Sequence, residues 1–182
     1  LGVAAGPGRT HPNMGTHNLL LALGPSAYLE VISIDPQAPP VTRARWFGLN
    51  DVLPDAAPRL AAWVASTDDI ANATTPELGE VETMQREAHT WQMTVRSDGS
   101  VPLGGAAPLL IARAPGANPV AALAQSGLLL RKLRIQHPDP ARVLAVLRRI
   151  ALAPEPIVTV AQSDRCSLVA EIQTPFGLRQ LG

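Results

Sequence analysis

The strongest candidate for chemistry in this sequence is a glutamate inside an apolar hairpin near its start. Glu30 stands between Leu29 and Val31, and the alternation of side chains along a strand places it on one face with Tyr28 and Ile32. Glutamate is uncommon in strands, and burying it without a partner is costly. Glu30 therefore points either outward into water or into a cavity, where a desolvated carboxylate with a raised pKa can accept and return a proton.

Four other residues of this region are candidates for binding a ligand. His17 either bonds a nearby backbone group or faces a ligand, and Asn18 either shapes the turn or donates a hydrogen bond to a ligand. Tyr28 shares the face of Glu30. Trp46 either lines a ligand site or, together with Phe47, anchors a loop on the core, which is the commoner use of such a pair.

A second candidate for proton transfer lies near the end of the sequence. Glu171 is in an expected strand, and Arg165 and Arg179 are close enough in sequence to pair with it, so it is either catalytic or a member of an ordinary ion pair. His11 and His137 each precede a proline in a turn and are predicted to be structural or to face solvent. No two histidines have the compact spacing of a zinc site, and no glycine-rich phosphate loop is present.

The elements that must position these residues are mostly strands. The hairpin has its turn at Gly24-Pro25-Ser26. A short helix near 70–73 follows the capping cluster Thr67-Asp68-Asp69, and a second helix begins at Pro140 after the N-cap Asp139. Apolar alternation and turn signals predict further strands at 62–65, within 81–95, and at 108–113, 128–136, 157–161, 167–173 and 178–181.

The order of these elements repeats along the chain. The last third is predicted to run strand, helix, strand, strand and one more strand, and the middle third repeats that order more loosely. This order predicts an α+β fold in three parts: an incomplete first module with a connecting loop at 1–57, a degenerate middle module at 58–125 and a last module at 126–182. Leu1-Gly2-Val3 resembles the end of a helix, so we expect a helix and a strand of the first module to be missing.

Composition narrows the class of protein. The 182 residues are 46% hydrophobic, enough to build a core for one structural unit. The 15 basic and 15 acidic side chains cancel and form no basic stripe, which argues against a nucleic-acid partner. Every apolar run is shorter than a membrane span, and no secretion signal is read. The single cysteine, Cys166, cannot form an internal disulfide, which fits a cytoplasmic protein.

Several stretches resemble the glyoxalase-like domain of the vicinal oxygen chelate superfamily, which includes glyoxalase I, extradiol dioxygenases and bleomycin- and fosfomycin-resistance proteins. The stretches that carry this resemblance are 11–23, 28–32, 45–49, 63–70, 108–111, 133–139 and 174–177. The resemblance implies strand-helix-three-strand modules that curl into mostly antiparallel half-barrel sheets. It also implies a divalent metal ion in the cleft, held by residues of the first and fourth strands of paired modules.

The resemblance assigns Glu30 to the fourth strand of the first module and Glu171 to the corresponding strand of the last one. Glu30 and His17 are the implied metal ligands, with Glu171 or His17 as the base. The middle module departs from the pattern, because 109–113 contains no acidic residue. The implied function is a metal-dependent lyase, isomerase or dioxygenase that acts on a small oxygenated molecule. The alternative is a non-catalytic, drug-sequestering binding protein, and either one is expected to form a homodimer.

Overall fold

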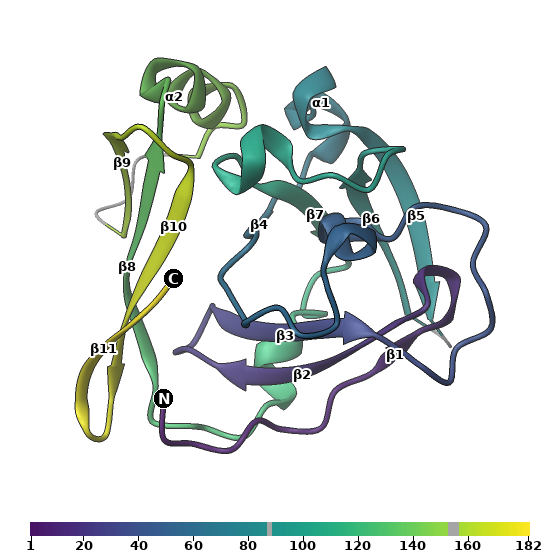
Figure 1. Ribbon diagram of the computed structural model, residues 1–182, viewed down its shortest axis with the longest axis horizontal. Coiled ribbons are helices and arrows are strands. Elements are labelled where there is room, and N and C mark those ends of the chain that lie inside the picture. Colours follow the sequence, from purple (N-terminus) through teal and green to yellow (C-terminus); the bar gives the residue numbers. More distant parts are fainter. Residues whose placement is uncertain (87–88, 153–156) are drawn as a thin grey trace.

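The fold is α+β, as predicted, and is built from three curled sheets (Figure 1). The computed structural model describes residues 1–86, 89–152 and 157–182. In this part of the chain no helix is long and apolar enough to cross a membrane. Each of the ranges 1–57, 58–125 and 126–182 contains one of the three sheets.

The first sheet carries Glu30 and has the order β1 (Thr10–His11), β2 (Thr16–Ala22), β3 (Tyr28–Ile34). Gly24 makes the turn possible, because its φ of 105° suits glycine and an added Cβ would lie 2.6 Å from Leu129 Cδ1. The register pairs Leu20 with Glu30 and Asn18 with Ile32. Since residues directly opposite one another share a face, the side chain of Asn18 lies on the same face as that of Glu30.

The second sheet faces this hairpin and has the order β4 (Val64–Ser66), β7 (Leu109–Arg113), β6 (His89–Val95), β5 (Glu80–Arg86). The crossover from β4 to β5 contains α1 (Ile70–Ala73), whose N-cap Asp69 accepts a hydrogen bond from Asn72 N at 3.3 Å. The register pairs Trp91 with both Met84 and Arg113. These three side chains therefore form one row across the sheet.

The third sheet has the order β11 (Gly177–Leu181), β10 (Ser167–Thr174), β8 (Leu129–His137), β9 (Val158–Gln162). Helix α2 (Pro140–Arg149) begins at the predicted N-cap Asp139 and buries Val143, Val146 and Leu147 against the sheet. The hydrogen-bonding order differs from that of the second sheet. There the first strand, β4, pairs with the fourth strand, β7, whereas in the third sheet the first strand, β8, pairs with its second and third strands.

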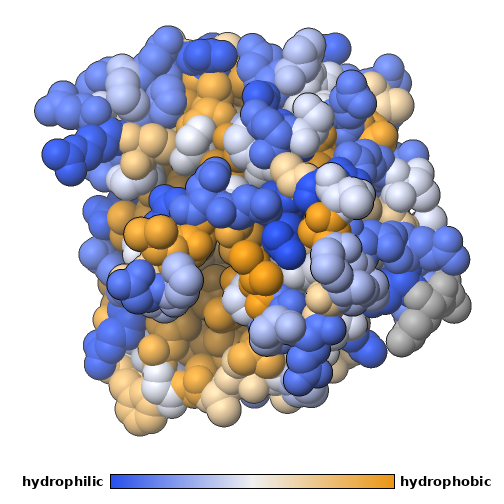
Figure 2. Space-filling view, turned by 45° about the vertical axis from the view of Figure 1, so that its right-hand side comes forward, coloured by the Kyte–Doolittle hydropathy of each residue, from blue (hydrophilic) through white to orange (hydrophobic). Residues whose placement is uncertain are grey.

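Two clusters of buried apolar side chains hold the sheets together. The larger one joins all three sheets and α2, and the smaller one lies between the first sheet and the second, around Met14, Trp46, Met84 and Met93. The segment that contains Trp46 is fastened to β5 by a two-pronged ion pair, in which Arg43 donates twice to Glu82 at 2.7 Å. In the space-filling view, apolar residues surround a hollow bordered by polar ones (Figure 2).

The start of the chain, where the end of a helix was expected at 1–3, lies beside the first sheet. Residues 1–5 contain no helix, and Gly6 N donates to Leu20 O at 2.9 Å, so the start of the chain runs in an extended conformation beside β2. The glycines and proline at 6–8 favour such an extended segment over a helical turn.

Candidate functional site

Glu30 points into the protein rather than into water. Asn18 Nδ2 donates to Glu30 Oε1 at 2.6 Å, from the strand beside it. Burial raises the pKa of Glu30, and the opposing effects of Asn18, Arg113 and Arg86 are smaller. Of the two interpretations of this hairpin glutamate, the structure supports the one with a desolvated carboxylate.

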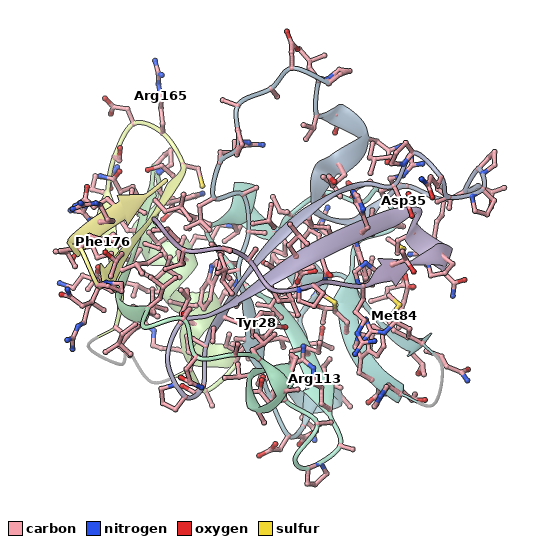
Figure 3. The ribbon with its side chains drawn as sticks, turned by 90° about the horizontal axis from the view of Figure 1, so that it is seen from below. Tyr28, Asp35, Met84, Arg113, Arg165 and Phe176 are labelled. Atoms are coloured by element: carbon pink, nitrogen blue, oxygen red, sulfur yellow. The ribbon has the colours of Figure 1, made fainter. Side chains whose placement is uncertain are left out.

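Tyr28 and Arg113 join the first sheet to the second beside Glu30. Arg113 Nη2, at the end of β7, donates to Tyr28 Oη at 2.9 Å, and Figure 3 shows the two residues next to each other. Burial raises the pKa of Tyr28, Arg113 opposes that rise, and the nearby Glu30 adds to it. Asn18, Tyr28, Glu30 and Arg113 therefore form one polar cluster between the two sheets, which we call the Glu30 cluster.

A cleft of about 310 Å³ adjoins this cluster. Its walls include His11, Trp46, Met84, Arg86 and Trp91. The guanidinium carbon of Arg86 lies 5.5 Å from the centroid of the Trp91 ring. The charge of Arg86 lowers the pKa of His11 in the cleft and those of Tyr28 and Glu30 in the cluster. Arg86 is thus the electrostatic link between the cleft and the Glu30 cluster.

His11 is held against Trp46 in the wall of the cleft. Its ring packs edge-on to Trp46, with centroids 5.1 Å apart and planes at 76°. Thr16 Oγ1 lies 3.2 Å from His11 Nδ1 and accepts a hydrogen bond from Trp46 Nε1 at 3.2 Å. Burial, with a smaller effect from Arg86, lowers the pKa of His11 to about 4, so the imidazole is neutral at pH 7.

The residues predicted from the sequence separate into two groups. Asn18, Tyr28 and Glu30 come together in the Glu30 cluster, and Trp46 lines the cleft. His17 is exposed, and its position between Thr16 and Asn18 places it on the opposite face of β2 from Asn18 and Glu30. The structure therefore does not bring Glu30 and His17 to one point, as a shared metal ion would require.

Glu171 lies in the third sheet, away from the Glu30 cluster. Its carboxylate pairs with Arg134 Nε of β8 at 3.4 Å, not with the expected Arg165 or Arg179. Figure 3 shows Arg165 on the other side of the molecule from Tyr28 and Arg113. The structure favours the ion-pair interpretation of Glu171 over the catalytic one.

The donors around Glu30 do not fit a divalent metal ion. Such ions take several carboxylate, imidazole or water ligands, and a nearby guanidinium repels them. In the described ranges no group of three or more His, Cys, Asp or Glu side chains could hold an ion. The charged residues that act on Glu30 are Arg113 and Arg86. Metal dependence stays a prediction from the resemblance, and no step below is derived through a metal.

Sequence reasoning missed three residues of this region: His11, Arg86 and Arg113. Arg113 ends an otherwise apolar strand, where an inward-facing arginine needs an acceptor, and that was the available signal. His11 was predicted to be structural or solvent-facing, and it is in fact a wall of the cleft. Only the pairing of His11 with Thr16 across a tight turn places it there, and nothing local in the sequence reveals that pairing.

Comparison with known proteins identifies the family. A family model described as a glyoxalase-like domain matches residues 1–151, a range that contains the whole Glu30 cluster and the cleft. The crystal structure of a hypothetical protein from Staphylococcus aureus has a similar fold, with a TM-score of 0.55 and 13% identity over 98% of this chain and 76% of that one. No curated protein matches this sequence. The chain belongs to the glyoxalase-like domain family.

Proposed function

We propose that the protein binds a small oxygenated molecule between β3, β5 and β7, and that Glu30 exchanges a proton with it, as in a lyase or isomerase. The observation that carries this proposal is a buried carboxylate, with a raised pKa, whose charged neighbours are arginines. A desolvated carboxylate is a stronger base than one in water, and a guanidinium stabilises the oxyanion that forms when a proton leaves a carbon beside a carbonyl group.

Each residue of the Glu30 cluster has a distinct part in this proposal. Asn18 holds Oε1 of Glu30, so that Oε2 is the oxygen that takes the proton. Arg113 holds the hydroxyl of Tyr28, and the two groups together face the developing charge on the substrate oxygen. Because the donors around Glu30 do not fit a divalent ion, the proton transfer is proposed for the side chains alone.

A second candidate is a binding protein that performs no chemistry. The observation that favours it is the aromatic cleft, which can hold a ligand without any help from Glu30. The two candidates differ in one respect: only the enzyme moves a proton of the bound molecule.

Exchange of carbon-bound hydrogen with deuterium tests the first candidate. Phenylpyruvate, pyruvate and hydroxyacetone are incubated with the protein in D₂O, and the loss of their C–H signals is followed by ¹H NMR against a protein-free control. We expect exchange catalysed by the wild type and slowed at least about 100-fold in Glu30→Gln. Glu171→Gln is the matched control and should exchange at the wild-type rate. Equal rates in Glu30→Gln and the wild type would contradict the role of Glu30, and binding without exchange would support the second candidate.

A further inference from the structure

The described residues that line the cleft beside the Glu30 cluster are basic and aromatic, without any acidic side chain. Its described lining residues include two arginines, Arg9 and Arg86, and no carboxylate. They also include the rings of Trp46, Trp91 and His11. At about 310 Å³, the cleft is at the small end of the roughly 300–1,000 Å³ that small-molecule sites occupy.

The apolar walls are suited to a flat molecule. Trp46 is 5% exposed and is fixed by Thr16 and by the edge-on His11, so its ring cannot turn freely. Met14 and Met84 also line the cleft and are 1% and 7% exposed. Thioether and indole groups make favourable contacts with aromatic rings. The walls therefore select a planar apolar body over a branched or strongly polar one.

Arg86 supplies the polar end of the cleft. Its guanidinium lies over the Trp91 ring, which leaves the edge of the group, with its N–H donors, able to bind an anion. None of the ion pairs between described residues involves Arg86 or Arg9. A guanidinium edge of this kind matches the two oxygens of a carboxylate.

We propose that this cleft binds an aromatic carboxylate, with the ring against Trp46, Met84 and Trp91 and the carboxylate on Arg86. The register supports this placement, because Met84, Trp91 and Arg113 form one row that leads from the cleft to the Glu30 cluster. A ligand held by Arg86 extends its oxygenated end toward Tyr28 and Glu30. The inference rests on the proposed function in this one respect, that the ligand occupies the region around Arg86.

Tryptophan fluorescence tests the choice of ligand. Two of the three tryptophans line the cleft, and the third, Trp63, donates instead to Ala106 O. We expect phenylacetate to change the emission in a saturable way. Phenylacetamide, which has the same shape without the charge, should bind at least about 10-fold more weakly, because it loses a charge-assisted hydrogen bond. Acetate keeps the charge but lacks the ring, so it should also bind at least about 10-fold more weakly, because it buries almost no apolar surface. Equal binding of phenylacetate and phenylacetamide would overturn the proposal.

Two variants of Arg86 locate the anion. Arg86→Gln should weaken phenylacetate at least about 10-fold and leave phenylacetamide within about 2-fold, and Arg86→Lys should fall between the wild type and Arg86→Gln. Arg131→Gln is the matched control, because Arg131 is exposed on β8 of the third sheet. Circular dichroism checks that each variant is folded. Unchanged phenylacetate affinity in a folded Arg86→Gln would overturn the assignment.

The exchange and binding experiments together distinguish an error in the ligand class from an error in the proposed proton transfer. If Glu30→Gln abolishes deuterium exchange while phenylacetate and phenylacetamide bind equally, the role of Glu30 in proton transfer is supported. The assignment of an aromatic carboxylate as the ligand is then contradicted. If phenylacetate binds selectively through Arg86 but no compound exchanges, the ligand class stands and the proton transfer is wrong.

Discussion

Glu30 and Glu171 are the same residue type in antiparallel strands of two different sheets, yet their surroundings are opposite. The carboxylate of Glu30 is desolvated, accepts a hydrogen bond from an amide, and has a raised pKa. Glu171 has a side chain that is 21% exposed and is paired with Arg134. Desolvation without an ion-pair partner makes a carboxylate a useful base, and only Glu30 has such surroundings of the two.

The strand order explains this difference. Arg113 of β7 bonds Tyr28 of β3, and a shared apolar cluster joins the two sheets. The second sheet therefore covers the face of β3 that carries Glu30. In the third sheet, β10 lies between β8 and β11, and Glu171 is directly opposite Lys132. The buried residues of this sheet face α2 and the core, so the charged ones gather on the other face. The first sheet therefore has its glutamate on a covered face, whereas the third sheet has its glutamate on the face opposite the core.

The largest expected difference between the two regions involves two buried threonines. Thr16→Val removes the oxygen shared by Trp46 and His11, leaves both ring nitrogens without that partner, and should lower the free energy of unfolding by about 2 kcal/mol. Thr174→Val, in the turn between β10 and β11, should cost about 1 kcal/mol.

Urea unfolding and tryptophan emission measure both threonine variants. Only Thr16→Val should change the emission of the folded protein, because Thr16 bonds Trp46, whereas Thr174 bonds the backbone of Gly177 and Phe176. An emission spectrum of Thr16→Val identical to that of the wild type would show that this bridge does not hold Trp46.

His11, in the wall of the cleft, should make the stability of the protein depend on pH. His11 has a pKa of about 4 in the folded protein, against about 6.5 when unfolded. Between these values the unfolded chain binds the extra proton, so the contribution of His11 to stability is present above pH 6.5 and is lost as the pH falls toward 4. We expect a loss on the order of 2 kcal/mol after allowing for its partial exposure.

Urea unfolding at several pH values isolates the effect of His11. The loss should be absent from His11→Gln and retained in His137→Gln, whose ring lies at the exposed start of α2. If His11→Gln follows the wild type at every pH, the imidazole is not buried as the structure shows.

Tyr28 is the only tyrosine, so its ionisation can be measured directly by ultraviolet absorbance. Its pKa should lie above the ordinary value because of burial. Glu30→Gln should lower that pKa, since a neighbouring negative charge is removed, and Arg113→Met should raise it, since a hydrogen-bonded cation is lost. Glu171→Gln should leave it unchanged. A response to Glu171→Gln as large as that to Glu30→Gln would contradict the separation of the two glutamates.

The smallest expected effect is that of Glu171→Gln on stability. A partly exposed ion pair contributes little, so the change in the free energy of unfolding should be about 0.5 kcal/mol or less at both pH 5 and pH 8.

Glu30→Gln should instead stabilise the protein more at pH 8 than at pH 5. The raised pKa of Glu30 means that wild-type stability is lost as the pH rises through it, and the glutamine has no charge to bury. Paired urea titrations of the two variants make the comparison.

Local signals predicted most of the fold. The hairpin turn at Gly24, the caps Asp69 and Asp139, and the alternation of 81–95 each specify an element through nearby residues, and the structure contains those elements.

The site was harder to predict than the fold. Tyr28 and Glu30 share a face by alternation alone, so that part followed from the sequence. The partner of Tyr28 is 85 residues away, at Arg113, and the pairing of His11 with Trp46 also depends on tertiary packing. Glu171 was assigned by analogy between modules, and the structure places it in an ion pair with Arg134 of the third sheet rather than in the Glu30 cluster.

The ion pair between Arg43 and Glu82 has a consequence for the width of the cleft. It ties the segment that carries Trp46 to the strand that carries Met84 and Arg86, so it connects two opposing walls. Both side chains are about one-third exposed, at 36% and 31%, and such a pair is weakened as the ionic strength rises. The ion pair should therefore weaken in concentrated salt, and the two walls that it connects should lie farther apart at 1 M NaCl than at 0.05 M.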